Sequence, residues 1–134
     1  ARNDGATPLY IACELGRLEC AQLLRDAGAG INQAMNDGVT PLFIASQEGQ
    51  LECVWLLLEA GAAIDQADEQ GATPLFVACL KGHLEIARLL LEASAAVNQA
   101  ADGGFSPLYG ACDKGHLEIA RLLLGWRGHE PSQG

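Results

Sequence analysis

The chain repeats itself at a fixed interval, and this repetition constrains its fold more than any other feature. Near copies of the segment Thr73–Ala78 (TPLFVA) begin at Thr7, Thr40 and Ser106, so successive copies start 33 residues apart. A single period across a whole chain is typical of stacked arrays, in which each unit contacts only its neighbours. We therefore expect one domain over residues 1–134, with repeats at about 3–35, 36–68, 69–101 and 102–134.

Each repeat predicts two helices. Thr73 is a favourable N-cap, and Pro74 suits the first helical position because its fixed φ fits a helix and its missing N–H costs no bond there. Gly82 ends this short helix, and a second helix starts near His83. The second helix is apolar around more than one narrow stripe, so both its partner helix and the next repeat must cover it. Ala and Leu dominate and aromatic residues are only 5% of the chain, which favours an all-α fold.

The segment after the second helix predicts a tethered turn. Gly28 and Gly61 stand where a left-handed residue is expected to end the helix, whereas the third repeat has Ser94 there. We expect Ser94 either to cost on the order of 1 kcal/mol or to adopt a different cap. Asn32 and Asp65 follow, and residues of this type are suited to bonding their own backbone.

Together these features resemble the ankyrin repeat. The resemblance rests on Thr-Pro-Leu-x-x-Ala at the first helix, on Gly82–Glu85 and Gly115–Glu118 (GHLE) at the second, and on the Leu run with its Gly-Ala and Asn or Asp loop. It covers nearly the entire chain and recurs four times. It implies an all-α solenoid of helix-turn-helix units with β-hairpin-like turn tips. It also implies a protein-binding scaffold without catalytic residues or cofactors.

The acidic composition limits the classes of partner. Only 8 basic residues oppose 17 acidic ones, and the net charge is −9. Phosphate binding needs clustered Lys and Arg, so we exclude nucleic acid and expect a protein or peptide partner that is basic and partly apolar. No apolar run approaches the roughly 18 residues of a membrane span, so we expect no membrane contact. The start at Ala1 has no signal-peptide character, which predicts a chain without a targeting signal of its own.

The five cysteines indicate core packing. None forms a CxxC pair, and Cys79 has the repeat position that Ser46 fills elsewhere, while Cys53 has the position of Ile86. A thiol that exchanges with Ser or Ile is typical of a structural residue, not of a disulfide or metal site. This use of cysteine predicts a reducing, cytoplasmic compartment.

The sequence contains no recognisable catalytic constellation. It has no Gly-x-Ser-x-Gly, HExxH, P-loop or GxGxxG motif. His83 and His116 share a repeat position with Arg17 and Gln50, and this exchange suits a polar residue that orders a turn better than a catalytic group. We therefore predict no catalytic residue, no metal ligand and no cofactor.

The turn tips and the ends of the first helices vary while the scaffold repeats. In the family that the chain resembles, these positions line a concave groove that usually binds the partner. An acidic row at the tips beside an apolar strip would attract and hold a basic, partly apolar peptide or helix. The alternative is that the acids only keep the array soluble. The predicted partner-binding residues are Asp4, Glu14, Leu15, Asp37, Val39, Gln47, Glu48, Glu69, Gln70, Leu80, Lys81, Asp102, Phe105, Asp113 and Lys114.

One position departs from the family pattern throughout. The usual His after Thr-Pro-Leu is replaced by Tyr10, Phe43, Phe76 and Tyr109. Because neighbouring helices pack about 8 to 10 Å apart, we expect these rings to pack between the first helices as a ladder. The alternative is an exposed aromatic stripe that binds a ligand.

A second departure is Trp55, whose repeat equivalents are Gln22, Arg88 and Arg121. It should lie on the outward, convex side of its helix. It marks either a patch for self-association or for a partner, or a half-buried ring that packs on Arg88. In the first repeat, Gln22 and Arg25 make the second helix more polar, as expected of a capping unit.

The leading hypothesis is a binding module without chemistry of its own. Two alternatives stay open: a structural spacer within a longer repeat array, and an engineered repeat protein without a natural partner. For the oligomeric state the sequence favours a monomer.

Overall fold

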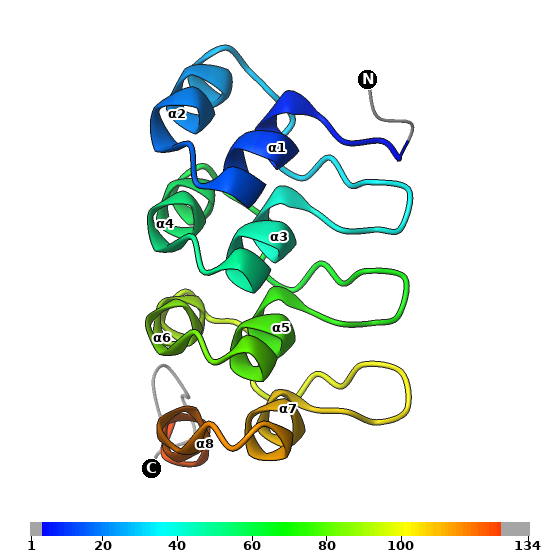
Figure 1. The fold of residues 1–134 in the computed structure, drawn as a ribbon, viewed down its shortest axis with the longest axis vertical. Coiled ribbons are helices and arrows are strands. Elements are labelled where there is room, and N and C mark those ends of the chain that lie inside the picture. The colour runs from blue at the N-terminus through cyan, green and yellow to red at the C-terminus, as the bar shows by residue number, and fades with distance from the viewer. Residues whose placement is uncertain (1–3, 127–134) are drawn as a thin grey trace.

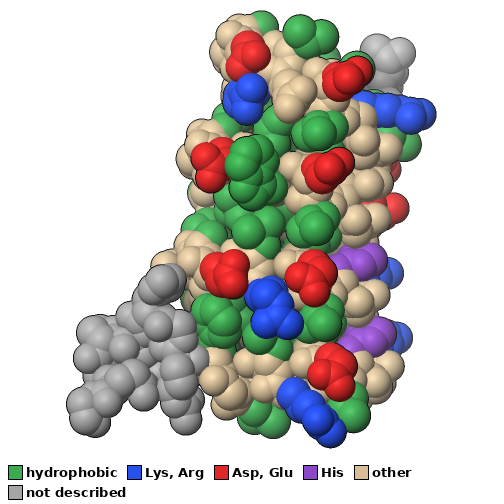
Figure 2. Space-filling model, turned by 90° about the vertical axis from the view of Figure 1, so that its left-hand side faces the viewer, with side chains coloured by type: hydrophobic (Ala, Val, Ile, Leu, Met, Phe, Trp, Pro, Cys, Tyr) green, Lys and Arg blue, Asp and Glu red, His purple; other side chains and the backbone are tan. Residues whose placement is uncertain are grey.

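The computed structural model describes residues 4–126, in which eight helices form four antiparallel pairs stacked in chain order (Figure 1). The first helices of the pairs make one layer, the second helices make another, and the turn tips project from the first layer. The first helices are α1 (Pro8–Leu15), α3 (Pro41–Glu48), α5 (Pro74–Lys81) and α7 (Pro107–Asp113). The second helices are α2 (Leu18–Asp26), α4 (Leu51–Glu59), α6 (Leu84–Glu92) and α8 (Leu117–Leu124). Figure 2 shows the outward face of the second layer.

The first helices begin where the repeated segment predicts. In α5 the Thr73 hydroxyl accepts a hydrogen bond of 3.1 Å from the Phe76 N–H, and Pro74 is the first helical residue. The other three first helices are capped in the same way, with Ser106 in place of Thr in α7. The side chain therefore satisfies a backbone donor that the first helical turn leaves without an internal partner.

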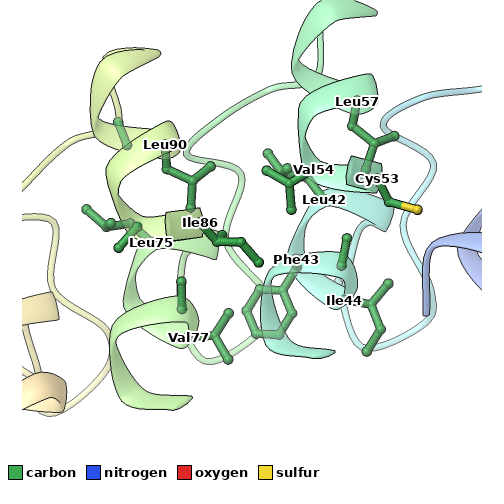
Figure 3. Close-up of a cluster of buried hydrophobic side chains, with 14 of the residues drawn as sticks. Leu42, Phe43, Ile44, Cys53, Val54, Leu57, Leu75, Val77, Ile86 and Leu90 are labelled. Atoms are coloured by element: carbon green, nitrogen blue, oxygen red, sulfur yellow. The ribbon is translucent and has the colours of Figure 1, made fainter. Parts of the chain in front are cut away.

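The core lies between the two layers and between neighbouring repeats. Figure 3 shows Leu42 of the second repeat and Ile86 of the third directed toward the space between the two repeats, and both side chains are almost completely buried. The second helices inside the stack are thus covered both by their partner helices and by the next pair. This arrangement confirms the all-α solenoid.

Neighbouring repeats are also joined by polar side chains at the start of each second helix. His83 and His116 each direct Nε2 at a backbone carbonyl of the preceding repeat, that of Gln47 at 3.0 Å and that of Leu80 at 3.1 Å. A carbonyl only accepts, so Nε2 carries the hydrogen. Gln50 donates to the Glu14 carbonyl at 3.1 Å in the equivalent way. Each bond satisfies a carbonyl at the end of a first helix, which confirms the ordering role predicted for this position.

The loops contribute a second set of bonds between repeats. The Oδ1 atom of Asn32 accepts from the Ala63 N–H at 2.8 Å, and that of Asp65 accepts from the Ala96 N–H at 3.0 Å. The expectation that these side chains bond their own backbone was therefore wrong. Their acceptors reach the next repeat because stacking brings its loop within hydrogen-bond distance.

The turn tips are hairpin-like and are joined to one another. Within a tip the backbone closes on itself, as in the Met35 N–H bond to the Val39 carbonyl at 2.9 Å. Between tips, the N–H groups of Asn36, Glu69 and Asp102 each donate to a carbonyl of the preceding tip at 2.8 to 2.9 Å. The stacked tips therefore form a continuous edge beside the first helices.

Ser94 adopts the strained conformation that its position predicts. Its φ is +80°, and it is the one non-glycine residue with positive φ among residues 4–126. Gly28 and Gly61 have φ of +87° and +88° at the equivalent positions. A side chain at such a φ crowds the backbone, so this turn keeps its shape at an energetic cost.

Candidate partner-binding surface

The predicted partner-binding residues fall on two adjoining strips, one along the turn tips and one along the ends of the first helices. We call the two strips together the groove surface. At the tips, Asp37, Glu69, Gln70, Asp102 and Phe105 are exposed and Asp4 is partly exposed. At the helix ends, Leu15, Glu48, Lys81, Asp113 and Lys114 are exposed, while Glu14, Gln47 and Leu80 are partly exposed.

Val39 does not belong to this surface. Its side chain is only 8% exposed and is part of the core, as is that of Ala72, which occupies the same position in the third repeat. The prediction for Val39 is corrected for this reason. Phe105 occupies that position in the fourth repeat and is 40% exposed. Unlike Val39 and Ala72, Phe105 is followed by no described repeat that could cover it.

The acids at the tips have two kinds of setting. The Asp37 carboxylate accepts from the Val39 N–H at 3.1 Å and so shapes its own turn. Glu69 and Asp102 lie one position earlier in their repeats, so the four tip acids do not share one register. In the third repeat the turn is instead shaped by Asp68, which accepts from the Gln70 N–H at 2.9 Å. Nothing in the repeat comparison pointed to Asp68, because no other repeat has an acid at this position.

The aromatic ladder is only partly as predicted. Tyr10 and Phe43 are each 5% exposed, and Phe43 lies beside Val77 of the next repeat (Figure 3). Phe76 is partly buried against Gly110, where an added Cβ would come within 3.3 Å of the ring. Packing between first helices is thus confirmed for these rings. Tyr109 differs because no described repeat follows it, and half of its side chain is exposed.

Tyr109 instead pairs with Phe105. The two ring centroids are 4.7 Å apart, and the planes are tilted by 42°. Such offset pairs are stabilising beyond the area that they bury. Beside this pair, between the third and fourth tips, lies a hollow of about 370 Å³. Its walls are mostly apolar and come from Gln70, Ala72, Phe76, Ala101, Asp102 and Phe105.

Charge is distributed unevenly along the groove surface. In the first two repeats its charged members are all acidic, namely Asp4, Glu14, Asp37 and Glu48. In the last two repeats Lys81 and Lys114 join the acids, and the Lys114 ammonium lies 4.0 Å from the Asp113 carboxylate. The surface therefore changes from acidic to mixed along the stack.

The cysteine side chains are unbridged thiols. Cys13, Cys53 and Cys79 are buried, whereas Cys20 and Cys112 are exposed in the first and last repeats. Burial raises the pKa of Cys79 to about 12, so this thiol stays protonated and unreactive. The pKa of Cys13 is also raised, first by a hydrogen bond with Cys53 and then by burial. The buried thiols act as packing residues.

The described residues were compared with the requirements of a metal site and of a membrane span. Within residues 4–126, no group of His, Cys, Asp and Glu side chains is arranged to hold a metal ion. No helix in the same range is long and apolar enough to cross a membrane.

Comparison with known proteins identifies the family. Residues 1–68 and 60–133 match the family described as ankyrin repeats in three copies, in agreement with the stacked helix pairs. The chain belongs to the ankyrin-repeat family. No curated protein matches it. Ankyrin repeats are generally non-catalytic modules of protein–protein interaction.

Proposed function

We propose that this protein is a non-catalytic module that binds a partner protein or peptide through the concave groove and the turn tips. The observation that carries the proposal is the exposed pair of Phe105 and Tyr109 beside the hollow at the third and fourth tips. The second and third repeats have the buried Val39 and Ala72 at the position of Phe105. At the position of Tyr109 they have Phe43, which is buried, and Phe76, which is partly buried. Exposed aromatic rings next to an apolar hollow are typical anchors of a protein contact.

The charges of the groove surface define the partner chemistry. Its acidic half, with Asp37 and Glu48, favours a segment that carries Lys or Arg. The hollow beside Phe105 favours an apolar side chain further along the same segment. Lys81 and Lys114 add attraction for an acidic group near that apolar anchor. The partner is therefore a protein or peptide that is basic at one end and partly apolar at the other, and the free thiols support a reducing, cytoplasmic location.

Selection from a displayed random-peptide library tests this function. We expect selected peptides to combine Lys or Arg with an apolar residue and to lose at least tenfold in affinity for Phe105→Ala. Alanine already occupies this position as Ala72 in the third repeat, so the variant should fold. Trp55→Gln, on the opposite face, serves as the control and should bind as the wild type does. If all the selected peptides that bind Trp55→Gln as they bind the wild type also bind Phe105→Ala at full affinity, the proposal is contradicted.

One observation favours a second function, that of a spacer segment in a longer array. The end face of the first repeat, which no described repeat covers, exposes apolar side chains. In later repeats the equivalent side chains pack against the repeat before them. Leu23 is 71% exposed there, whereas Leu56 is completely buried. If the library yields no peptide whose binding depends on Phe105, the spacer function becomes the better interpretation.

A further inference from the structure

A second groove lies on the opposite side of the molecule, on the outward face of the second helices. It has a volume of about 480 Å³ and crosses α2, α4 and α6. Leu18, Leu51, Trp55 and Leu89 provide its apolar lining, and Glu52 and Glu85 are among its polar members. Figure 2 shows hydrophobic side chains grouped along the middle of this face. The groove surface described above contributes no residue to it.

The groove depends on a local departure from the repeat pattern. Trp55 is 51% exposed and Leu51 is 41% exposed. The repeat position of Trp55 is otherwise polar, filled by Gln22 in the groove and by Arg88 at its edge. The exposure of Trp55 confirms that it points outward. A large ring at an exposed position that is polar elsewhere makes this region a candidate contact surface.

Two rows of acidic side chains run along the sides of the groove. One row stands near the starts of the second helices and comprises Glu19, Glu52, Glu85 and Glu118. The other stands near their ends and comprises Asp26, Glu59 and Glu92. All seven residues are exposed, and Figure 2 shows acidic side chains on both sides of the hydrophobic strip.

The distance between the rows matches the width of a helix. Glu52 and Glu59 are seven positions apart on α4, which corresponds to about 10 Å along a helix axis. An α-helix with its side chains is about 10 to 12 Å across. A helix laid along the strip would therefore place its apolar side on Trp55 and Leu51 and its two flanks over the acids.

We propose that this groove binds an amphipathic helix of a partner protein, with its apolar side on Trp55 and with Lys or Arg along both flanks. Packed helices lie about 8 to 10 Å apart, so acids of one row recur at about that interval. Residues seven positions apart return to the same side of a helix and are about 10 Å apart, so basic residues at this spacing on one flank of the partner helix would meet successive acids.

Charge argues against a second copy of the chain as the occupant. Two copies meeting through this face would bring acidic rows against acidic rows, in a chain with a net charge of −9. Two arginines of the face already contact its own acids: the Arg25 Nε lies 2.9 Å from the Asp26 carboxylate, and the Arg88 Nε lies 3.8 Å from the Glu85 carboxylate. A basic helix complements this face, whereas a second copy repels it.

Titration calorimetry with two model peptides tests the proposal. The first is a 14-residue helical peptide with Leu on one side and Lys along both flanks of that side, and the second carries Glu in place of every Lys. We expect saturable binding of the Lys peptide that weakens with added salt, and no binding of the Glu peptide. Trp55→Gln should weaken binding of the Lys peptide at least tenfold.

The controls separate this groove from other acidic surfaces. Trp55→Gln leaves the net charge unchanged and introduces the residue that the first repeat has as Gln22, and circular dichroism checks that it folds. Phe105→Ala should bind the Lys peptide as the wild type does, because Phe105 lies outside this groove. A failure of the groove proposal is therefore distinct from a failure of the proposed function, which depends on Phe105. Equal affinity of the wild type and Trp55→Gln would overturn the proposal. So would binding of the Glu peptide, or a wild-type dimer that Trp55→Gln abolishes in sedimentation.

Discussion

The interior of the stack and its two ends place the same sequence positions in opposite environments. Leu56 is completely buried between repeats, whereas its equivalent Leu23 is 71% exposed in the first repeat. At the other end, Cys112 is exposed although its equivalent Cys79 is buried. Burial in this protein is therefore decided by the presence of a neighbouring repeat, since the residue types are the same or nearly so.

The polar positions show the same contrast. His83 and His116 each bond a carbonyl of the repeat before them, whereas Arg17 occupies this position in the first described repeat. The polar residues Gln22 and Arg25 predicted a capped first repeat, yet the end face exposes Pro8 and Leu23. The polarity of Gln22 and Arg25 lies on the outward side of the helix and does not extend to its end-facing side, so the capping role stays a prediction.

The largest expected difference between interior and end concerns two leucines at one repeat position. Leu56→Ala should lower the free energy of unfolding by about 2 to 5 kcal/mol, because it leaves a cavity between repeats. Leu23→Ala should change it by less than about 0.5 kcal/mol, because water already surrounds the side chain. Urea unfolding of both variants measures the difference. Equal losses would show that the ends are as well packed as the interior.

Two glycines give the next largest contrast. Gly82 and Gly115 both have positive φ, so alanine should cost each about 1 kcal/mol. A Cβ at Gly82 would also come within 2.6 Å of the His116 ring, while nothing lies within 4 Å of Gly115. Because this would displace His116 from the Leu80 carbonyl, Gly82→Ala should lower the free energy of unfolding by about 2 to 3 kcal/mol in total.

A double-mutant cycle assigns the extra cost at Gly82. In a His116→Ala background the ring is absent, so Gly82→Ala should cost no more than Gly115→Ala does in the wild type. Thermal or urea unfolding of the four variants supplies the cycle. An undiminished cost in that background would mean that the loss comes from the backbone alone.

A smaller effect is expected where one polar side chain joins two repeats. His83→Ala should cost about 1 kcal/mol, because the Gln47 carbonyl loses its donor. His83→Gln should be close to neutral, since Gln50 makes the equivalent bond at 3.1 Å. Arg17→Ala is the matched variant in the first repeat, and its free energy of unfolding should lie within about 0.5 kcal/mol of that of the wild type. A His83→Gln variant as unstable as His83→Ala would contradict the shared role.

The smallest expected effect is a gain in stability. Ser94→Gly should raise the free energy of unfolding by about 0.5 to 1 kcal/mol, because glycine tolerates the φ of +80°. Gly61→Ser places the same strain one repeat earlier and should lower it by a similar amount. If Ser94→Gly is destabilising, the serine makes a compensating contact and the strain interpretation fails.

Much of the local structure could be predicted because it depends on short-range chemistry. The Thr cap, the proline after it and the glycine at the helix end act within a few residues of the chain, so α5 begins and ends where Thr73 and Gly82 predict. The positive φ of Ser94 was one of the two outcomes predicted from its position, for the same reason. Most of the groove surface also follows from the period, because repeating side chains of one position lie along one side of the stack.

What could not be predicted depends on atoms far away in sequence. The burial of Val39, the partner of Asn32 and the pairing of Tyr109 with Phe105 are all set by how closely repeats approach one another. The groove at Trp55 is a further example, since its acidic rows become two parallel lines only when the helices are stacked. A period specifies which positions are equivalent, but not how far each side chain reaches.

By itself the sequence determined the number of repeats, the starts of the first helices and the all-α class, because caps, turns and apolar periodicity are local properties. Only the tertiary structure decided which equivalent side chains are covered, which polar groups join one repeat to the next, and where apolar and acidic side chains form grooves. The physical reason is that solvent exposure and hydrogen-bond distance belong to pairs of repeats. A residue such as Leu56 is buried by its neighbours, while the same leucine at position 23 remains in water.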